Sequence, residues 1–430
     1  MIAKNIAFKT LGCRLNQYET DSIASAFHQN KFNIVDFDAD ADVYVINTCT
    51  VTNQGDQKSR QEIRKALKKG NDPVVVVTGC MVNNKSQNLD RFEGVTYFVE
   101  NAHKNAIFNL VDAHFKGETL TPENLKPDIF GFEPASKTFH TRAMIKIQDG
   151  CDNFCTFCIV PKVRGRASSR PYQDIENNIK KVLEYGYKEL VLTGVNIGRY
   201  EHEGMNFEDL VEKILNIPGD FRVRISSIEP EGFGEKLFDL FEHPKLMPNL
   251  HLCLQSGSDK ILLKMRRMYN LKTFTGMIES IRSRYPDFNL TTDIIVGFPG
   301  ETEEDFKQSV KVIRDYQFSH VHTFKYSKRD GTRAARMEDQ IPNKIKQERS
   351  RVIREIAEEN KLAYRKSLIR KKQRVLIEKV NANGFAKGYG DHYVPVEFKT
   401  SGNKTNVFAD VLLEGLKSEK NPVLTAKQLD

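Results

Sequence analysis

The stretch AMIKIQDGCDNFCTFC, residues 143–158, decides the fold of this chain, because it joins an apolar strand pattern to three closely spaced cysteines. Cys151, Cys155 and Cys158, called the loop cysteines below, have the spacing C-x3-C-x2-C. Cysteine thiolates normally hold all four irons of a cubane iron–sulfur cluster. Three thiolates leave one iron of the cluster without a protein ligand. A catalytic zinc ion has a comparable open coordination position, at which its reaction takes place. The stretch therefore predicts a 4Fe-4S site with a position for a further ligand.

Three other cysteines lie far apart in the sequence but share one local setting. Cys13, Cys49 and Cys80, called the sheet cysteines below, end the segments IAFKTLGC, VYVINTC and VVVVTGC. Each segment has the apolar, β-branched pattern of a buried strand, and a helical pattern follows it. The carboxyl ends of parallel strands meet at one sheet edge, where ligands bind. We therefore expect the sheet cysteines to meet there and to hold a second 4Fe-4S cluster.

Zinc, disulfides and ordinary buried thiols are the alternatives. A structural zinc site needs a fourth Cys or His at short spacing, and the next histidine after the loop cysteines is His202. Seven cysteines, an odd number, and the lack of an apolar signal after Met1 favour reduced thiols in a cytoplasmic protein. For the sheet cysteines, plain buried thiols stay open, because no short motif joins them. Cys253 lies in an expected strand and is interpreted as a core residue.

Size and charge indicate several domains and a polyanionic partner. A chain of 430 residues predicts two or three domains, and no apolar run is long enough for a membrane span. Residues 344–374 hold twelve Lys or Arg against four Glu, an excess equal to the net charge of +8. Such a stretch favours RNA as a partner. The alternative is a solvated helix, because an apolar stripe runs at helical spacing through Ile345, Val352, Ile356 and Ala363.

The order of predicted elements divides the chain into blocks. Residues 1–118 alternate strands and helices, which predicts a parallel α/β sheet, and the proline-containing residues 119–141 are interpreted as a linker. Residues 142–366 resume the alternation with six strand candidates, which predicts a parallel (β/α)6 partial barrel. Residues 367–430 contain short alternating strands separated by Gly and Asn, which predicts a small antiparallel β-barrel.

These features together resemble a known family. The run CDNFCTFC is similar to the signature of radical S-adenosylmethionine (SAM) enzymes, and the whole chain resembles their methylthiotransferase branch. That branch has an N-terminal cluster domain, a radical SAM partial barrel and a C-terminal RNA-binding barrel of the TRAM type. The segments TLGCRLNQYETD and QDGCDNFCTFCIVPKVRGRASSRP look most like those of the tRNA N6-threonylcarbamoyladenosine methylthiotransferases.

The resemblance implies radical chemistry that the cofactors supply and the protein positions. SAM would chelate the open iron at the loop cysteines, and its reductive cleavage would give the radical that removes hydrogen from C2 of the modified adenine. Sulfur at the sheet cysteines, methylated by a second SAM, would then be inserted. The partners implied are the tRNA anticodon loop and an electron donor such as flavodoxin.

The resemblance also implies binding residues for SAM and for RNA. Several of the SAM positions follow predicted strands, and a capping, turn or core role is the alternative for them; the usual Gly-Gly-Glu turn is absent from residues 194–196. The candidates for SAM are Phe157, Gly194, Asn196, Glu229, Gln255, Ser256, Asp293 and Gly297. The candidates for RNA are Lys162, Arg164, Arg166 and Arg170, with Phe385, Tyr389, His392 and Tyr393 as aromatic and basic groups in the C-terminal barrel, or as its core.

Two groups of alternative functions remain at this point. One keeps the chemistry but changes the substrate, to N6-isopentenyladenosine of tRNA or to an aspartate of a ribosomal protein. The other is a non-catalytic iron–sulfur RNA-binding protein or redox carrier. Binding and reductive cleavage of SAM separate the second group from the first.

Overall fold

The computed structural model describes residues 4–70, 72–136 and 139–429. These residues form two compact units, which are described separately. Unit 1 comprises residues 1–185, 193–196 and 327–335, and unit 2 comprises residues 186–192, 197–326 and 336–430.

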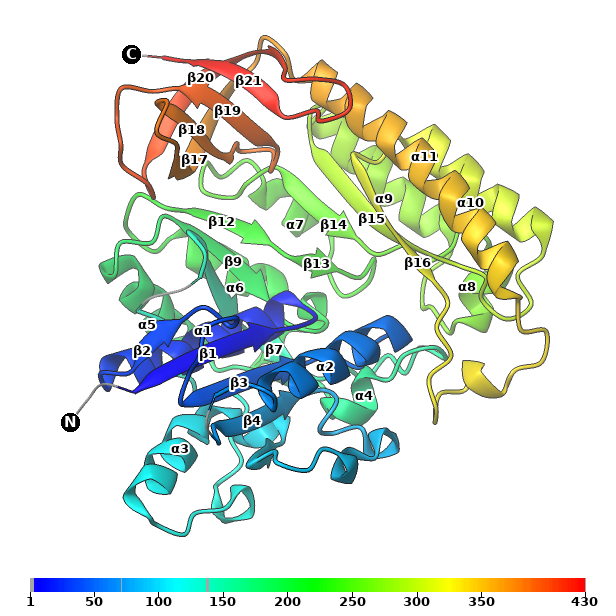
Figure 1. Ribbon diagram of the computed structural model, residues 1–430. Coiled ribbons are helices and arrows are strands. Elements are labelled where there is room, and N and C mark those ends of the chain that lie inside the picture. Colours follow the sequence, from blue (N-terminus) through cyan, green and yellow to red (C-terminus); the bar gives the residue numbers. More distant parts are fainter. Residues whose placement is uncertain (1–3, 71, 137–138, 430) are drawn as a thin grey trace. The chain divides into compact units, whose positions relative to one another are not determined.

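Unit 1 is built on a five-stranded parallel sheet of order β2-β1-β3-β4-β5. Alternate strand residues point to opposite faces, so Val43 and Val45 pack in one apolar core and Tyr44 and Ile46 in another. Helices α1 and α3 cover the first face and α2 covers the second (Figure 1). The bounds are β1 Asn5–Thr10, α1 Arg14–Gln29, β2 Asn33–Val35, β3 Val43–Thr48, α2 Asn53–Ala66, β4 Val74–Gly79, β5 Tyr97–Val99 and α3 Ile107–Lys116.

The rest of unit 1 contains short elements that carry the loop cysteines. Strands β7 and β8 pair in antiparallel fashion on either side of the cysteine loop. The elements are η1 Lys85–Gln87, η2 Leu89–Arg91, η3 Asn101–Ala106, η4 Pro122–Asn124, β6 Ala143–Lys146, β7 Gln148–Asp149, α4 Val160–Val163, β8 Ser168–Ser169 and α5 Tyr172–Glu184. Most of the predicted linker, residues 119–141, is described, and residues 137 and 138 lie outside the described ranges.

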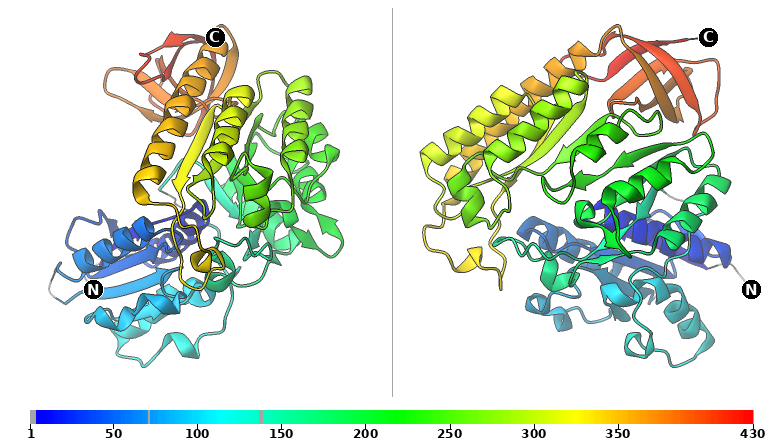
Figure 2. Two further views of the ribbon diagram at one scale, coloured as in Figure 1. Left: turned by 90° about the vertical axis from the view of Figure 1, so that its right-hand side faces the viewer. Right: turned by 180° about the vertical axis from the view of Figure 1, so that it is seen from behind.

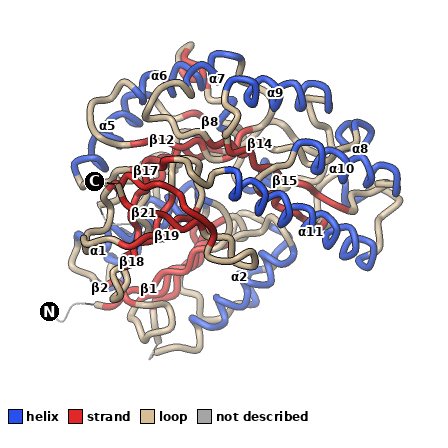
Figure 3. The backbone as a smooth tube through the Cα atoms, turned by 90° about the horizontal axis from the view of Figure 1, so that it is seen from above, coloured by secondary structure: helices blue, strands red, loops and turns tan. Residues whose placement is uncertain are grey.

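Unit 2 contains the parallel strands of the predicted barrel. Strand β12 pairs with β9, and β13, β14, β15 and β16 form a four-stranded parallel sheet. Helices α6, α7 and α9 lie on the outer side of β12, β14 and β15 (Figure 3). The bounds are β9 Glu189–Thr193, η5 Ile197–Arg199, β10 Glu201–His202, β11 Met205–Asn206, α6 Phe207–Leu215, β12 Arg222–Ile225, β13 Ser227–Ile228, α7 Glu235–Leu240, β14 Asn249–Leu252, α8 Asp259–Lys264, α9 Leu271–Arg284, β15 Asn289–Val296, α10 Glu303–Tyr316 and β16 His320–Lys325. The last residue of β9 and the first two residues of η6, Ala334–Arg336, are assigned to unit 1.

The basic stretch forms helix α11, Asn343–Ser367, which lies beside α10 and β16 (Figure 2). Its buried stripe differs from the predicted one. Ile356 is buried, but Ile345 and Ala363 are exposed. Two of the basic side chains face inward instead: Lys346 donates to the Tyr326 carbonyl at 3.2 Å and Arg349 to Glu301 Oε2 at 2.6 Å. The predicted buried face of α11 was partly wrong because a basic side chain can be buried when it has a hydrogen-bond acceptor there. A pattern of apolar residues does not reveal such a position.

The C-terminal residues close into the predicted small barrel. Its strand order is β17-β18-β19-β21-β20, with one parallel pair, β19 with β21, among otherwise antiparallel neighbours. Inward side chains such as Val375, Val396 and Val411 form its apolar core. The bounds are β17 Lys372–Val380, β18 Phe385–Tyr389, β19 Pro395–Lys399, β20 Phe408–Leu416 and β21 Leu424–Gln428. Among the described residues, no helix is both long and apolar enough to span a membrane.

Candidate functional site

The sheet cysteines follow three neighbouring parallel strands of unit 1. Cys13 comes after β1, Cys49 directly after β3 and Cys80 directly after β4. The register pairs Thr10 with Asn47 and Thr48 with Gly79, so these strands end at one edge. The fold therefore places three thiols from distant sequence positions along one sheet edge.

Close backbone packing holds two of these cysteines together. Gly12 has a φ of +96°, and a Cβ on it would lie 2.9 Å from the Cys49 Cβ and 3.1 Å from its Sγ. Only glycine fits there without displacing the thiol. Ser59 of α2 fixes the Cys49 backbone, accepting from its N–H at 3.2 Å and donating to its carbonyl at 3.0 Å. Burial raises the pKa of the Cys49 thiol to about 11, and the negative charges of Cys80 and Cys13 add to the rise.

The loop cysteines lie on a tight loop between β7 and α4. The N–H of Cys158 donates to the Cys155 carbonyl at 3.0 Å, and the N–H of Cys151 donates to the Gly165 carbonyl at 3.2 Å. Gly150, which precedes the loop, has a φ of +69°, and a Cβ there would overlap the Arg166 carbonyl oxygen at 1.9 Å. All three loop cysteines are partly accessible. The loop therefore keeps all three loop cysteines partly accessible to solvent.

Helix α4 connects the two cysteine sets within unit 1. Ile159, next to Cys158, and Val163 at the end of α4 form a small buried cluster with Cys80. The side chain of Asn101 donates to the Val163 carbonyl at 2.7 Å. One short helix thus has a loop cysteine at its start and packs against a sheet cysteine.

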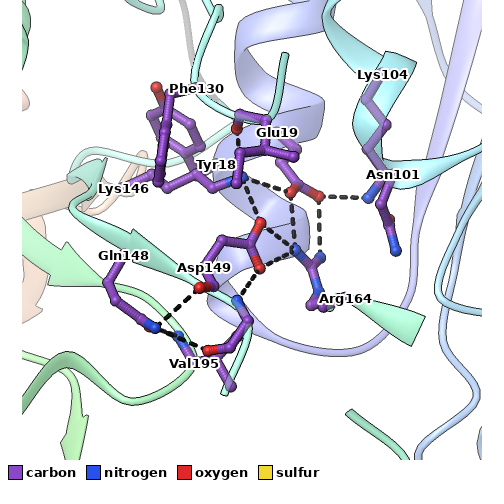
Figure 4. A network of polar contacts seen from close by, with 12 residues as sticks. Tyr18, Glu19, Asn101, Lys104, Phe130, Lys146, Gln148, Asp149, Arg164 and Val195 are labelled. Carbon is purple, nitrogen blue, oxygen red and sulfur yellow. Dashed lines mark hydrogen bonds and ion pairs between the residues drawn. The ribbon is translucent and has the colours of Figure 1, made fainter. Parts of the chain in front are cut away.

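A buried network of charges lies beside this helix (Figure 4). Arg164 donates to Glu19 Oε1 at 3.0 Å and Oε2 at 3.1 Å, and to Asp149 Oδ1 at 3.0 Å and Oδ2 at 2.9 Å. Lys146 joins Glu19 at 3.2 Å and Asp149 at 2.7 Å, and Lys104 also pairs with Glu19. All five side chains are at most 3% exposed. This network could not be predicted from the sequence, because its members lie on four separate segments.

The charged neighbours within this network determine the pKa values of its side chains. Burial alone would raise the pKa of Glu19, but Arg164, Lys104 and Lys146 outweigh it and hold that pKa well below its usual value. The pKa of Asp149 is lowered in the same way by Arg164 and Lys146, against burial. Burial opposes the charge of Arg164, yet Asp149, Glu19, Cys80 and Cys13 raise its pKa well above normal. Glu19, Asp149 and Arg164 therefore favour their charged forms near neutral pH.

The spacing of the thiols bears on which metal group could fit. Within the part of the chain that the structure describes, His251, Cys253 and Asp293 are the metal-ligand side chains whose donor atoms all lie within 4.8 Å of one another, and neither cysteine set meets this limit. Two sulfurs on one zinc ion are at most about 4.6 Å apart, given a Zn–S distance of about 2.3 Å. A four-iron cluster is larger than one ion and takes its thiolates at wider spacing, and three thiols at each site suit a cluster with one open iron.

The His251 group has an explanation within the fold. His251 Nε2 lies 3.1 Å from Asp293 Oδ1, and its Nδ1 lies 2.8 Å from the hydroxyl of Thr291, the register partner on β15. These contacts join β14 to β15 on the face where both strands carry polar residues. Cys253 is buried next to them, in agreement with its interpretation as a core residue.

The predicted SAM contacts fall into both units. In unit 1, Phe157 is half-buried, and the backbone N–H groups of Val195 and Asn196 both donate to Gln148 Oε1 at 2.9 Å. The side-chain amide of Asn196 is buried, and neither its nitrogen nor its oxygen has a hydrogen-bond partner among the described residues. An unpartnered buried amide is costly, so this residue fits a site for a polar ligand.

In unit 2, the other predicted contacts have the following positions. Glu229 follows β13 and forms an ion pair with Arg267. Gln255 has a φ of +71°, so the turn after β14 is strained at a non-glycine residue. The next residue, Ser256, is buried. Asp293 lies within β15, three residues before its end. Gly297 follows β15, and its N–H donates to Glu301 Oε2 at 2.6 Å.

Two of the four predicted RNA contacts are corrected by the structure. Arg164 is 3% exposed and fully engaged in the charged network. Arg170 is also buried, and it donates to Asn178 Oδ1 at 3.2 Å. Neither guanidinium can reach phosphate, because each is enclosed by its partners. Arg166 is 76% exposed and pairs with Asp152, and Lys162 is exposed, so these two stay available.

Most of the predicted aromatic RNA groups of the C-terminal barrel are half-buried. The barrel docks on the amino-terminal end of β12 through two buried arginines of unit 2. Arg222 donates to the Tyr389 carbonyl and Arg224 to the Gly390 carbonyl, each at 2.8 Å, and the Arg224 guanidinium lies 4.7 Å from the Tyr393 ring centre. His392 bonds with Gln373, and Tyr389 stacks on Tyr393. Phe385 is the one of the four that is well exposed.

Comparisons with known proteins agree with this architecture. Residues 5–100 match the uncharacterized protein family UPF0004, and residues 145–313 match the radical SAM superfamily. Among solved structures, the radical SAM methyltransferase TsrM from Kitasatospora setae, with cobalamin and a [4Fe-4S] cluster bound, has a TM-score of 0.56 and covers 78% of this chain and 74% of its own. At 15% identity this likeness concerns the fold alone.

Relatives similar over nearly the whole chain are more informative. The threonylcarbamoyladenosine tRNA methylthiotransferase MtaB of Bacillus subtilis is 37% identical over 408 residues, 92% of this chain and 90% of the relative. Its counterpart in Thermotoga maritima is 35% identical over 424 residues, 97% and 96%. The tRNA-2-methylthio-N6-dimethylallyladenosine synthase of Chromobacterium violaceum is 32% identical over 393 residues, 88% of each.

Proposed function

The chain belongs to the radical SAM methylthiotransferases, and on that premise we propose that it adds a methylthio group to C2 of N6-threonylcarbamoyladenosine in tRNA. One observation carries the proposal: the chain has two three-cysteine sites within one unit and is 34–37% identical to four relatives named for this activity. Relatives named for dimethylallyladenosine reach 31–33%, which makes that base the second candidate.

The cofactors are iron–sulfur clusters and SAM. In the proposal the loop cysteines hold one 4Fe-4S cluster and the sheet cysteines hold the other. When bound, the cluster at the loop cysteines supplies the electron that cleaves SAM. The protein's part is to offer three thiolates at each site and to leave one iron of each cluster accessible.

Residues near the strand ends would hold SAM. Asn196, with its unpartnered buried amide, would bind the amino or carboxylate group, and Gly194 would let the backbone come close. Phe157 would pack on the adenine. Glu229, Gln255, Ser256, Asp293 and Gly297, which lie in unit 2, stay candidate SAM contacts on the ground of the family resemblance.

Exposed basic residues would bind the anticodon loop. Lys162 and Arg166 are exposed beside the loop cysteines, and Phe385 is an exposed aromatic side chain suited to an unstacked base. We also propose that the protein acts in the cytoplasm with an electron donor such as flavodoxin. The division proposed for the chain is a cluster domain at 1–118, a linker at 119–141, a radical SAM domain at 142–366 and a TRAM domain at 367–430.

The test is mass spectrometry of tRNA nucleosides from a host that lacks the activity. The wild-type gene should convert N6-threonylcarbamoyladenosine to its 2-methylthio form. The matched control, Cys155→Ala, should give none, because it removes one ligand of the loop site.

Two other results would change the proposal. A methylthio group on isopentenyladenosine would keep the chemistry and overturn the substrate. No change in any tRNA nucleoside, with iron and sulfide present in the purified protein, would overturn the tRNA function and direct the search to a ribosomal protein or to a non-catalytic role.

A further inference from the structure

The buried network around Arg164 holds more basic than acidic side chains. Arg164, Lys104 and Lys146 are its basic members, and Glu19 and Asp149 are the two carboxylates that they contact. All five are nearly inaccessible to water. An uncompensated buried charge is expensive, so an anion is expected nearby.

The sheet cysteines are the nearest candidates for that anion. The amide of Asn16, which accepts from Arg164 at 2.6 Å, donates to the Leu11 carbonyl at 2.7 Å and the Thr48 carbonyl at 3.1 Å. Those carbonyls precede Cys13 and Cys49 in the chain, and the Thr48 carbonyl also accepts from the N–H of Cys80 at 3.2 Å. One amide thus connects the guanidinium to the backbone beside all three thiols.

The charges of the network act on these thiols. Arg164 donates to Asn16, whose amide bonds to the backbone beside Cys13 and Cys49, and Glu19 accepts from the same guanidinium. A charge that favours a thiolate also favours any additional negative charge on a group that the thiolates bind.

We propose that Arg164 is a positioning residue that sets the reduction potential of the cluster held by the sheet cysteines. The inference rests on the proposed ligand set. The buried cation stabilises the more negative, reduced form and so raises the potential, and Glu19 limits this effect. Charges and hydrogen bonds around the ligands of a cluster are established means of tuning its reduction potential.

The experiment is a redox titration, followed by electron paramagnetic resonance, of the full-length protein with its loop cysteines replaced by alanine, so that one cluster titrates. In Arg164→Met the ratio of reduced to oxidised cluster at a fixed ambient potential should fall at least tenfold, which is about 59 mV for one electron. Glu19→Gln should change the ratio in the opposite direction, because it removes a negative charge.

Two controls separate charge from structure. Arg166→Met removes the same charge two residues along the chain, where the side chain is 76% exposed and water screens it, so the ratio should stay within twofold of the wild type. Arg164→Lys keeps the charge but loses the fork of hydrogen bonds, and should lie closer to the wild type than Arg164→Met.

The measured potentials either support or overturn the proposed effect of Arg164, even if one variant does not fold. If Arg164→Met does not fold, the upward shift in Glu19→Gln still supports it. Unchanged potentials in Glu19→Gln, or equal shifts in Arg164→Met and Arg166→Met, would overturn it. The titration needs no tRNA, so an inactive protein with the predicted shifts would refute the proposed function and leave this inference standing.

Discussion

The loop cysteines and the sheet cysteines differ in what brings them together. The loop set lies within residues 151–158, and a tight turn of the backbone fixes its geometry. The sheet set spans residues 13–80 and meets because three parallel strands end at one edge. The first arrangement is local and the second depends on the whole sheet, so disturbances of the fold should reach the two sets unequally.

The largest expected effect is the loss of one ligand in the loop. Cys155→Ala leaves two thiolates at the open-iron site, so SAM cleavage should fall to background and methylthio transfer with it. Release of 5′-deoxyadenosine under reducing conditions measures the first, and nucleoside analysis the second. Substantial cleavage in this variant would contradict the assignment of the loop site.

The sheet set should give a different pattern. Cys49→Ala removes one of its ligands but leaves the loop intact, so SAM cleavage should persist while methylthio transfer is lost. The same two assays distinguish the sites in parallel samples. Equal loss of both activities would show that the two sets do not have separate roles.

The network between the sets should be important for stability. Arg164→Met removes the guanidinium that bonds to all four carboxylate oxygens of Glu19 and Asp149 and leaves Lys146 as the basic side chain that contacts both. Breaking a buried ion pair typically costs about 3–5 kcal/mol. Denaturant unfolding of the protein without clusters measures this directly. The exposed pair of Arg166 and Asp152 provides the comparison, and Arg166→Met should cost less than about 1 kcal/mol. Similar losses for the two variants would argue against the buried network.

Two carboxylates on α1, the helix after Cys13, should affect the stability of the protein in opposite ways as pH changes. Glu19 has cationic partners, so its lowered pKa contributes stability above its unfolded pKa, and this is lost as pH falls. Asp21 is buried with one hydrogen bond, from the Phe139 N–H at 3.3 Å, and burial raises its pKa to about 7. The raised pKa means that Asp21 costs stability above about pH 7, and that this cost disappears as pH falls toward its unfolded pKa.

Asp21→Asn should therefore stabilise the protein at pH 8 by up to about 4 kcal/mol and have little effect near pH 4. Thermal or denaturant unfolding of both proteins across this range measures the difference. A stability gain that is constant with pH would mean that Asp21 is not protonated in this range.

Much of this arrangement could be predicted from the sequence because its signals are local. The sheet was predicted from the strand patterns before the sheet cysteines, and the loop from the spacing of the loop cysteines. The order of the parts followed from the order of these patterns along the chain. The role of Arg164 could not be predicted, because its partners Glu19 and Asp149 lie on other segments. The sequence near a cluster motif does not show whether an arginine there is buried or exposed. The same applies to Tyr393, which is half-buried because Arg224, from a distant segment, packs against its ring.

The most direct test of the central claim is a count of iron and sulfide in three proteins, the wild type and the variants in which either cysteine set is replaced by alanine. Two four-iron clusters predict about eight irons in the wild type and about four in each variant. Electron paramagnetic resonance should then show one distinct reduced cluster in each variant. Replacement of the sheet cysteines without any loss of iron would contradict the account, because it would mean that the meeting of three strand ends holds no cluster.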